Sequence, residues 1–332
     1  MRFLANILVL TALVLPCLEA HVDQTQSPQT CITRAALDIG SGGTKLSVGD
    51  IDPVTNRILR IRDEIVIGVK LRRDLALNPD GLLSDQIQGE LIRTIKQLKD
   101  RVSKFEPVQL SAVATSVFRT AKNGLEVLKK MEDATGVRVR LLSQNEEGEI
   151  GFASAIAASQ EAKESIIVWD SGSGSFQLTT YMNDNIEMYG AEFGMTPAYE
   201  RLFAIRGQPV ALGIPIPPVS LDEALLLSEV IRAELPYAPE WTSSGHKHVV
   251  AIGGSSIFSR AATAIGKLEY HKEEVFQAMV DACSKNNEEL SPLIVSLALL
   301  YTVMDHCSIE TLTYCKTNGS TEGLLTTPKI WE

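Results

Sequence analysis

Residues 35–49, AALDIGSGGTKLSVG, and residues 166–181, IIVWDSGSGSFQLTTY, share one pattern that indicates the architecture of the chain. Each begins with a short apolar run that ends at an aspartate, Asp38 or Asp170, and continues through a Gly/Ser loop into another run. Apolar runs of this length bounded by glycines favour strands over helices. The sequence therefore predicts a strand–turn–strand unit in each half of the chain.

The elements that follow these units alternate in a similar order in both halves. In the first half we expect strands at 58–69, 108–114 and 137–142, and helices at 83–102, 124–135 and 146–159. In the second half we expect strands at 166–170, 175–182, 185–191, 248–252 and 311–315, and helices at 197–203, 221–235, from 255, 271–283 and 291–306. Alternation of this kind predicts an α/β fold.

The duplicated order describes two ribonuclease H-like lobes of the actin-like ATPase superfold, which also includes sugar kinases, Hsp70 and actin. We expect an N-terminal lobe over residues 31–150 and a C-terminal lobe over residues 151–332. The composition, 45% hydrophobic and 22% charged, predicts packed cores for both.

The net charge of −10 argues against a broad nucleic-acid-binding face. The same charge repels a polyanionic ligand at long range. Such a ligand would need local backbone N–H donors, a few cations and a metal. We expect no nucleic-acid partner and no stable membrane span, and we leave a homodimer open.

Residues 1–20 are typical of a signal peptide. Arg2 supplies a positive start, and residues 3–15 are nearly all apolar but too few to span a membrane. The segment ends in a small residue, as a cleavage site should; a lipid anchor at Cys17 and an uncleaved anchor stay open. We expect export to the periplasm or the extracellular space, with residues 21–30 as a mobile lead-in.

Four cysteines follow that cleavage point: Cys31, Cys283, Cys307 and Cys315. An exported chain with an even number of cysteines could form two disulfides, and the alternative is four buried thiols. Cys283 and Cys307 flank two adjacent predicted helices, so they are the candidate pair. The chain has no Cys-x-x-Cys pair and no histidine spacing typical of a zinc site.

The Gly/Ser loops after Asp38 and Asp170 are candidate phosphate sites. Glycines let backbone N–H groups turn toward an anion and form a concave nest. Two facing loops could clamp a phosphate chain while the two aspartates hold Mg²⁺ against its oxygens. A hairpin turn is the alternative for the first loop and a flexible linker for the second. The candidate phosphate-binding residues are Gly40, Ser41, Gly42, Gly172, Ser173, Gly174 and Ser175.

A third glycine turn joins the strand at 248–252 to the next helix. Backbone donors at the start of a helix favour an anion, so Gly253, Gly254 and Ser255 are further phosphate-binding candidates. A close strand–helix turn without a ligand explains them equally well. A fourth turn, residues 317–323, is typical of a plain surface loop when taken alone.

Two segments bring charge to the end of a predicted strand. Arg119 lies where the strand at 108–114 passes into a helix, and its guanidinium could hold a phosphate in bidentate fashion. An exposed surface arginine is the alternative. Residues 143–149 are acidic and begin a helix, so they could simply suit the helix dipole. A carboxylate there that faces the phosphate site could instead orient or deprotonate an attacking water.

Six of these segments, taken in order, resemble the Ppx/GppA family of exopolyphosphatases and guanosine pentaphosphate phosphohydrolases. Each is a weak motif alone, but the ordered set is specific and spans about residues 31–325. The segments are residues 38–41, 114–123, 143–148, 170–175, 253–255 and 319–324.

The resemblance implies a magnesium-dependent hydrolase of phosphoanhydride bonds that releases terminal phosphate from inorganic polyphosphate or guanosine pentaphosphate. It implies that Glu147 is the catalytic glutamate and Arg119 a phosphate ligand. It also implies that Asp38 and Asp170 lie beside the magnesium ion.

The chain departs from the family pattern at three places. Residues 41–45 read Ser-Gly-Gly-Thr-Lys, where the family usually has Ser-Asn-Ser, and residues 171–173 are less glycine-rich than usual. Gln177 stands where many members have a second glutamate.

Some of these departures are similar to the apyrase-type nucleoside triphosphate diphosphohydrolases, notably residues 145–148 and 175–177. Hydrolysis of nucleoside triphosphates or diphosphates is therefore an alternative function. Residues 42–45 are similar to a sugar-kinase loop, although Glu147 and export count against a kinase. A non-catalytic module that binds a phosphorylated ligand is the remaining alternative.

Overall fold

The computed structural model describes residues 31–331 except 107, 211–214, 244, 246 and 255. The expected signal peptide and lead-in lie outside the described residues, as does Ser255. Within the described part of the chain, no helix combines the length and the apolar character needed to cross a membrane.

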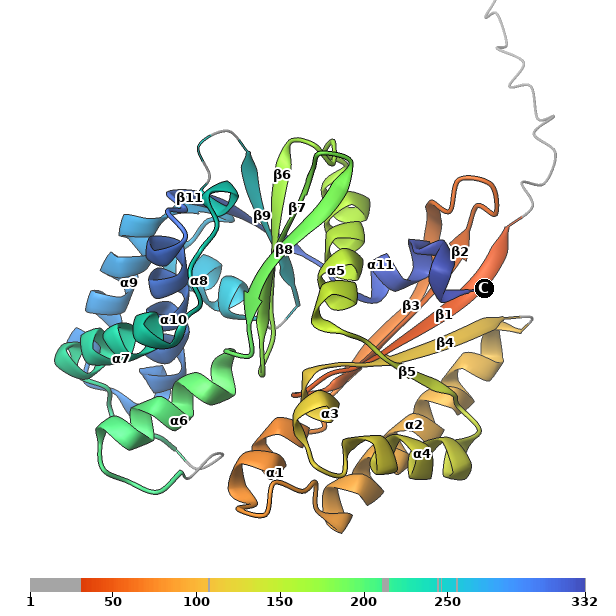
Figure 1. Cartoon of the computed structure of the whole chain (residues 1–332), viewed down its shortest axis with the longest axis horizontal. Helices are drawn as coiled ribbons and strands as arrows, with labels where there is room; N and C mark the ends of the chain where they lie inside the picture. Colours follow the sequence, from red (N-terminus) through yellow and green to blue (C-terminus); the bar gives the residue numbers. More distant parts are fainter. Residues whose placement is uncertain are drawn as a thin grey trace, which may run out of the picture. The chain divides into compact units, whose positions relative to one another are not determined.

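The first half forms a five-stranded sheet in the order β3-β2-β1-β4-β5 (Figure 1). The first three strands pair antiparallel, and β4 and β5 continue the sheet in parallel to β1. The strands are β1 (Ile32–Ile39), β2 (Thr44–Ile51), β3 (Ile58–Ile67), β4 (Gln109–Ala114) and β5 (Val139–Leu141).

Strand β1 is buried on both faces, which explains its nearly continuous apolar run. Leu37 and its neighbours in alternate positions pack against α2 (Asp85–Val102) and α4 (Gly124–Thr135). Ala36 points to the other face and packs against Leu324 of α11 (Thr321–Thr326). The short helices α1 (Leu71–Leu77) and α3 (Ser116–Thr120) complete this half.

The second half forms a six-stranded sheet in the order β10-β11-β9-β6-β7-β8. Strands β6, β7 and β8 repeat the antiparallel meander, and β9 and β11 extend the sheet in parallel to β6. The strands are β6 (Ile166–Ser171), β7 (Phe176–Met182), β8 (Asn185–Ala191), β9 (His248–Gly253), β10 (Glu269–His271) and β11 (Thr311–Lys316).

One face of this second sheet carries the largest hydrophobic core. Trp169 of β6 is fully buried there and makes an edge-on contact with Phe258, with ring centroids 5.1 Å apart. Helix α10 is buried almost all round, which explains its apolar sequence. The helices that contribute to this core are α6 (Met195–Ile205), α7 (Leu221–Glu234), α8 (Ile257–Ile265), α9 (Lys272–Ser284) and α10 (Ser291–His306).

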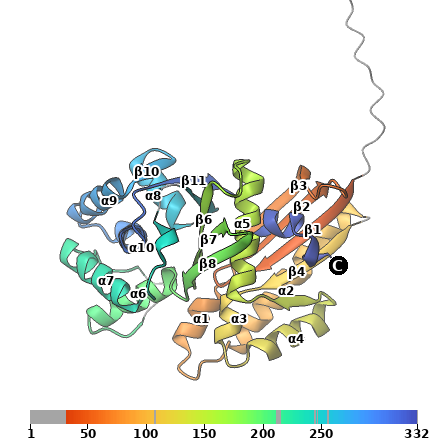
Figure 2. The same ribbon diagram turned by 45° about the horizontal axis from the view of Figure 1, so that its top comes forward.

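Helix α5 (Gln144–Ser159) packs on the second sheet and also contributes to a hydrophobic cluster of the first, and α11 packs beside it (Figures 1 and 2). Ile150 of α5 joins the core of the first sheet, whereas Phe152 joins that of the second. The expected division at residue 150 falls inside this helix. Gly323 of α11 donates its N–H to Ser154 Oγ of α5 at 2.7 Å.

Several expectations differ from the structure. Helix α1 and strand β10 were not predicted. They have only seven and three residues, which are too few to show a periodic pattern of apolar residues. The turn at 317–323 is not a plain surface loop, since it leads into α11, where Thr321 is fully buried. The expected pair of Cys283 and Cys307 is wrong: both are free thiols buried in apolar surroundings, and burial raises the pKa of Cys307 to about 12.

Candidate active site

The two Gly/Ser loops lie against each other. Each closes in the same way, with Gly40 N–H bonded to Gly43 O at 3.0 Å and Gly172 N–H bonded to Ser175 O at 2.9 Å. A Cβ atom added to Gly42 would lie 2.4 Å from Ser173 Oγ. The fold therefore brings together the two loops that the sequence predicts as phosphate sites.

Neighbouring groups hold both loops in place through hydrogen bonds to the carbonyl oxygens of the loops. The backbone N–H of Arg72 at the start of α1 donates to Ser41 O at 2.9 Å, and Lys70 Nζ donates to Gly42 O at 3.1 Å. In the second loop, the N–H of Thr196 donates to Ser173 O at 2.8 Å. Gly174 lies so close to Ser41 and Ser116 that an added Cβ would come within 2.9 Å of both hydroxyl oxygens.

Asp38 lies near the end of β1 and forms an ion pair with Lys45, its partner across the β1–β2 ladder. Lys45 Nζ lies 3.2 Å from Asp38 Oδ2. The other oxygen, Oδ1, is buried and has no hydrogen-bond partner among the described atoms. Burial lowers the pKa of Lys45, but Asp38 and Asp170 outweigh this and raise that pKa above its ordinary value. Lys45 is therefore a charged ammonium between two carboxylates.

Asp170 is the counterpart of Asp38 on β6. Burial raises the pKa of Asp170, and the charge of Lys45 opposes that rise. Ser320 Oγ donates to Asp170 Oδ2 at 3.3 Å. The adjacent Gly319 lies against Lys45, since an added Cβ would come within 2.2 Å of Lys45 Nζ. The fourth glycine turn therefore lines this site.

Glu147 lies in the first turn of α5, which Ser143 and Glu146 cap. Its Oε2 accepts a hydrogen bond from Arg119 Nη1 at 2.9 Å. Burial raises the pKa of Glu147 to about 7; Arg119 lowers it, and the charges of Asp170 and Asp38 add to the rise. The structure thus places the two predicted catalytic residues in contact and raises the pKa of Glu147 toward neutrality.

The two neighbouring glutamates point elsewhere. Glu146 pairs with Arg140 and caps α5, while Glu149 pairs with Lys329. Glu147 alone of the three reaches Arg119 in the described structure.

Arg119 binds a second carboxylate, Glu192, which the sequence did not single out. Glu192 Oε1 accepts from Arg119 Nη2 at 2.8 Å and from Nε at 3.3 Å, and its Oε2 accepts from Ser116 Oγ. Glu192 follows β8 of the second sheet, whereas Ser116 and Arg119 belong to α3 beside the first. Only the tertiary structure brings these residues together, so no local sequence signal could have found Glu192.

Gln177 lies opposite Asp170 in the β6–β7 ladder. Its side chain is buried, and Nε2 donates to Ser175 Oγ at 3.2 Å. This amide helps to hold the second Gly/Ser loop and adds no negative charge beside Asp170.

The charges and the orphaned oxygen suit a hard cation. Four carboxylates, those of Asp38, Asp170, Glu147 and Glu192, face two cations, Lys45 and Arg119. The described residues contain no group of three or more His, Cys, Asp or Glu side chains that could hold a metal by themselves. Mg²⁺ is usually bound by one or two carboxylates together with water and substrate phosphates. Asp38 and Asp170 fit such an ion.

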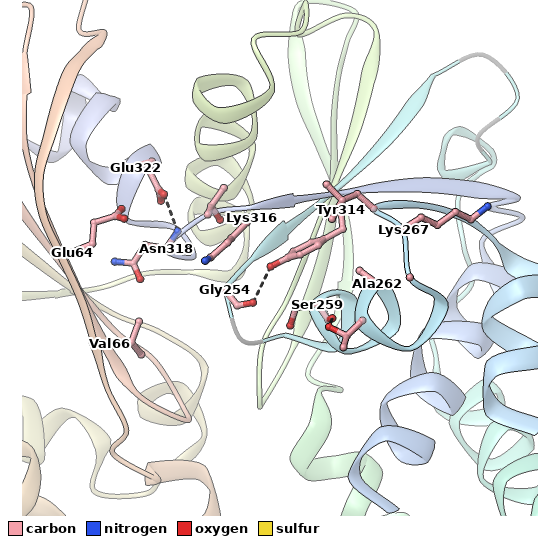
Figure 3. A pocket seen from close by; sticks show the side chains of 14 residues that line it. Glu64, Val66, Gly254, Ser259, Ala262, Lys267, Tyr314, Lys316, Asn318 and Glu322 are labelled. Atoms are coloured by element: carbon pink, nitrogen blue, oxygen red, sulfur yellow. Dashed lines mark hydrogen bonds between the residues drawn. The ribbon is translucent and has the colours of Figure 1, made fainter. Parts of the chain in front are cut away.

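The third glycine turn borders a cavity and lies against the fourth turn, since a Cβ added to Gly254 would lie 3.3 Å from Thr317 O. Tyr314 Oη donates to the carbonyl oxygens of Gly253 and Gly254 at 2.7 and 2.9 Å. Gly254 lines a cavity of about 970 Å³ (Figure 3). Side chains from both halves of the molecule line it, among them Glu64, Ser259, Lys316, Asn318 and Glu322.

Residues 50–204 match the model of the Ppx/GppA phosphatase family. A curated relative, the bifunctional 3-dehydroquinate synthase/phosphatase of Fusobacterium nucleatum, is 26% identical over 160 residues. That alignment covers 46% of this chain and 24% of the relative, so the matching part spans about a quarter of that longer protein.

Solved structures show the same fold. The Ppx/GppA family member from Aquifex aeolicus is 18% identical, with 90% of this chain and 98% of that chain covered and a TM-score of 0.68. An exopolyphosphatase from Cytophaga hutchinsonii is 15% identical over 89% and 97% of the two chains, with a TM-score of 0.66. Nucleoside triphosphate hydrolases from Neospora caninum are 10% identical over 91% and 93%, with a TM-score of 0.55.

The predicted α/β fold with two actin-like lobes is confirmed, and so is the resemblance to the Ppx/GppA phosphatases.

Proposed function

We propose that this relative of the Ppx/GppA phosphatases is a hydrolase of phosphoanhydride bonds that releases terminal phosphate from inorganic polyphosphate or guanosine pentaphosphate with Mg²⁺. One observation carries the proposal: the half-buried pair of Glu147 and Arg119 lies in the same site as two Asp-led Gly/Ser loops. The family match supports a phosphatase. Within the site, Glu147 is the candidate base and Arg119 the candidate phosphate ligand, and the two aspartates are the candidate ligands of the metal.

In this mechanism, Glu147 orients the attacking water and accepts its proton. Its carboxylate is largely excluded from solvent and has a pKa of about 7, close to the value that suits a general base. Arg119 and Ser116 hold the phosphoryl group, and Lys45 offsets its charge. Phosphoryl transfer depends mainly on such positioning and charge stabilisation. A magnesium ion held by Asp38 and Asp170 would neutralise phosphoryl oxygens.

The cavity favours a second candidate, hydrolysis of a nucleoside triphosphate or diphosphate. It borders the site, because Asn318 lines it and the next two residues, Gly319 and Ser320, contact Lys45 and Asp170. Two lysines in its wall offset the charges of Glu64 and Glu322, so the cavity has no excess of positive charge to hold a polyphosphate chain, whereas its polar groups could hydrogen-bond a base or a sugar. A nucleoside could therefore lie there while its phosphates extend toward the loops.

Phosphate release by the purified protein decides between these functions. The substrates are polyphosphate, guanosine pentaphosphate, ATP and ADP, each with and without Mg²⁺. Release from the first two supports the first proposal, and preference for ATP and ADP supports the second. If none of the four is hydrolysed, the chain is a non-catalytic module that binds a phosphorylated ligand.

Substitution of Glu147 tests the mechanism in the same assay. Loss of a general base typically lowers the rate by about 10²–10⁴-fold, so we expect this loss in Glu147→Gln. Glu149→Gln is the matched control, because Glu149 pairs with Lys329 and not with Arg119. Full magnesium-dependent activity of Glu147→Gln would show that another group is the base.

We also propose export of the mature chain, on the pattern of residues 1–20. N-terminal sequencing of the protein from its native host should then begin near His21, and an intact Met1 on the mature protein would contradict the proposal.

A further inference from the structure

The backbone around Glu192 is fixed to the second Gly/Ser loop. Met195 N–H and Thr196 N–H donate to the carbonyl oxygens of Gly172 and Ser173. Gly194 packs so closely here that an added Cβ would lie 2.5 Å from Gly172 O. Glu192 therefore moves with the phosphate loop of the second half.

The side chain of Glu192 reaches the first half of the molecule. It accepts three hydrogen bonds, two from the guanidinium of Arg119 and one from the hydroxyl of Ser116. Ser116 is buried, and the side chain of Arg119 is 18% exposed. The Glu192 side chain is itself 36% exposed, and its carboxylate bridges the two halves.

This bridge uses the donors that the proposed reaction needs for a phosphoryl group. Arg119 Nη1 is engaged by Glu147 and by the carbonyl oxygen of Leu142. Glu192 takes the other side of the guanidinium, Nε and Nη2, with one carboxylate oxygen. A phosphoryl group and this carboxylate would compete for the same hydrogen bonds, because both are anions that suit the guanidinium fork.

We propose that Glu192 is a specificity-determining residue, an internal carboxylate that occupies Arg119 and Ser116 until a more highly charged phosphate ligand displaces it. The inference rests on the proposed function, since it takes Arg119 as the phosphoryl ligand.

Two consequences follow for the ligands. A single orthophosphate gains few contacts beyond Arg119 and Ser116, so it competes poorly with Glu192. A chain of phosphates also contacts the two Gly/Ser loops and a bound metal, so it can displace the carboxylate. After hydrolysis, the return of Glu192 to Arg119 would favour release of the orthophosphate product.

The test measures equilibrium binding of inorganic orthophosphate by calorimetry in the presence of Mg²⁺, so that no turnover is needed. Apparent affinity falls with the fraction of protein whose site is free. We therefore expect Glu192→Gln to bind orthophosphate on the order of tenfold more tightly than the wild type. Glu187→Gln removes the same charge from an exposed position on β8 and should bind as the wild type does.

A second variant distinguishes the hydrogen bonds of Glu192 from the long-range repulsion between its charge and the phosphate. Glu192→Asp keeps the charge but is one methylene too short to hold both Arg119 and Ser116, so it should also bind orthophosphate more tightly. If thermal denaturation shows that Glu192→Gln does not fold, the orthophosphate affinity of Glu192→Asp alone tests the inference.

Affinity in both folded Glu192 variants that equals or falls below that of the wild type would overturn the inference. Tighter binding without hydrolysis of any phosphoanhydride would contradict the proposed function and leave the role of Glu192 intact.

Discussion

Burial and the neighbouring charge of Arg119 shift the pKa of the Glu147 carboxylate in opposite directions. Loss of hydration raises its pKa, Arg119 lowers it, and the carboxylates of Asp170 and Asp38 raise it again, with a net value of about 7. A carboxylate with an ordinary pKa would be a weaker base for water, and without Arg119 the pKa of Glu147 would be higher still. The pair therefore makes Glu147 a usable base near neutral pH.

This pKa predicts how activity depends on pH. A general base works only when deprotonated, so protonation of Glu147 removes activity as the pH falls below about 7. We expect kcat/KM of the wild type to rise about tenfold per pH unit on the acidic side of this pKa and to level off above it. The break should lie below pH 7 when Mg²⁺ offsets the charges of Asp38 and Asp170, which help to raise the pKa. Steady-state phosphate release across this range measures the profile. A profile that stays flat on the acidic side of pH 7 would show that Glu147 does not act as the base.

Sequence reasoning found Glu147, Arg119 and the two aspartates because each lies in a local motif. Glu146 and Glu149 point elsewhere because residues one and two apart on a helix do not share a face. Lys45, Glu192 and Ser320 were not predicted as parts of the site. Their roles depend on partners far along the chain, and no local pattern records such contacts.

The helices and strands that were predictable are those with a clear periodic pattern of apolar residues or a clear capping residue. Helices at 124–135 and 291–306 and the strand at 185–191 have the predicted bounds. Helix α5 begins two residues earlier than expected, at the capping box of Ser143 and Glu146. Helix α11 was missed because its six residues show no period and follow a glycine turn that looks like a surface loop.

Helix α11 packs tightly on α5 beside the site. We therefore expect that one methyl group added at Gly323 strongly lowers the stability of the fold. An alanine Cβ at Gly323 would lie 1.9 Å from the carbonyl oxygen of Ile150, so α11 would have to move away from α5. We expect Gly323→Ala to lower the free energy of unfolding by about 3 kcal/mol or more. Activity should fall as well, because α11 follows Ser320, the partner of Asp170.

The control for this substitution is Gly89→Ala in α2. Gly89 lies inside a helix with only the end of the flexible Arg93 side chain near its added Cβ, so alanine should stabilise the fold by about 0.5–1 kcal/mol. Thermal and denaturant unfolding measure both variants. Equal stability of Gly323→Ala and the wild type would contradict the tight packing of α11 on α5.

For the molecule as a whole, the duplicated strand order was enough to predict two lobes. The way in which the halves join was not, because α5 contributes to the cores of both sheets and α11 returns to the first sheet after β11 of the second. The site lies where elements of both halves meet: the two Gly/Ser loops touch, and Glu192 bridges them at Arg119. The relative motion of the halves should therefore control access of the phosphates.

A designed disulfide between the two loops tests whether motion of the halves limits the access of the phosphates. An added Cβ at Gly42 would lie 3.4 Å from the Cβ of Ser173, close to the separation of about 3.5–4.5 Å found in disulfides. If a phosphate chain enters between the loops, the halves must separate to admit it. The oxidised Gly42→Cys/Ser173→Cys variant should then lose at least about tenfold in kcat/KM, with recovery on reduction.

The two single variants and the wild type, oxidised in the same way, are the controls for the substitutions themselves and for the native thiols at Cys31, Cys283, Cys307 and Cys315. Mass spectrometry establishes that the cross-link has formed. Because the cross-link holds the loops at the separation already seen here, it blocks opening without distorting the closed arrangement. A fully cross-linked variant that hydrolyses substrate as fast as its reduced form would mean that phosphates reach Arg119 by another route, with no separation of the halves.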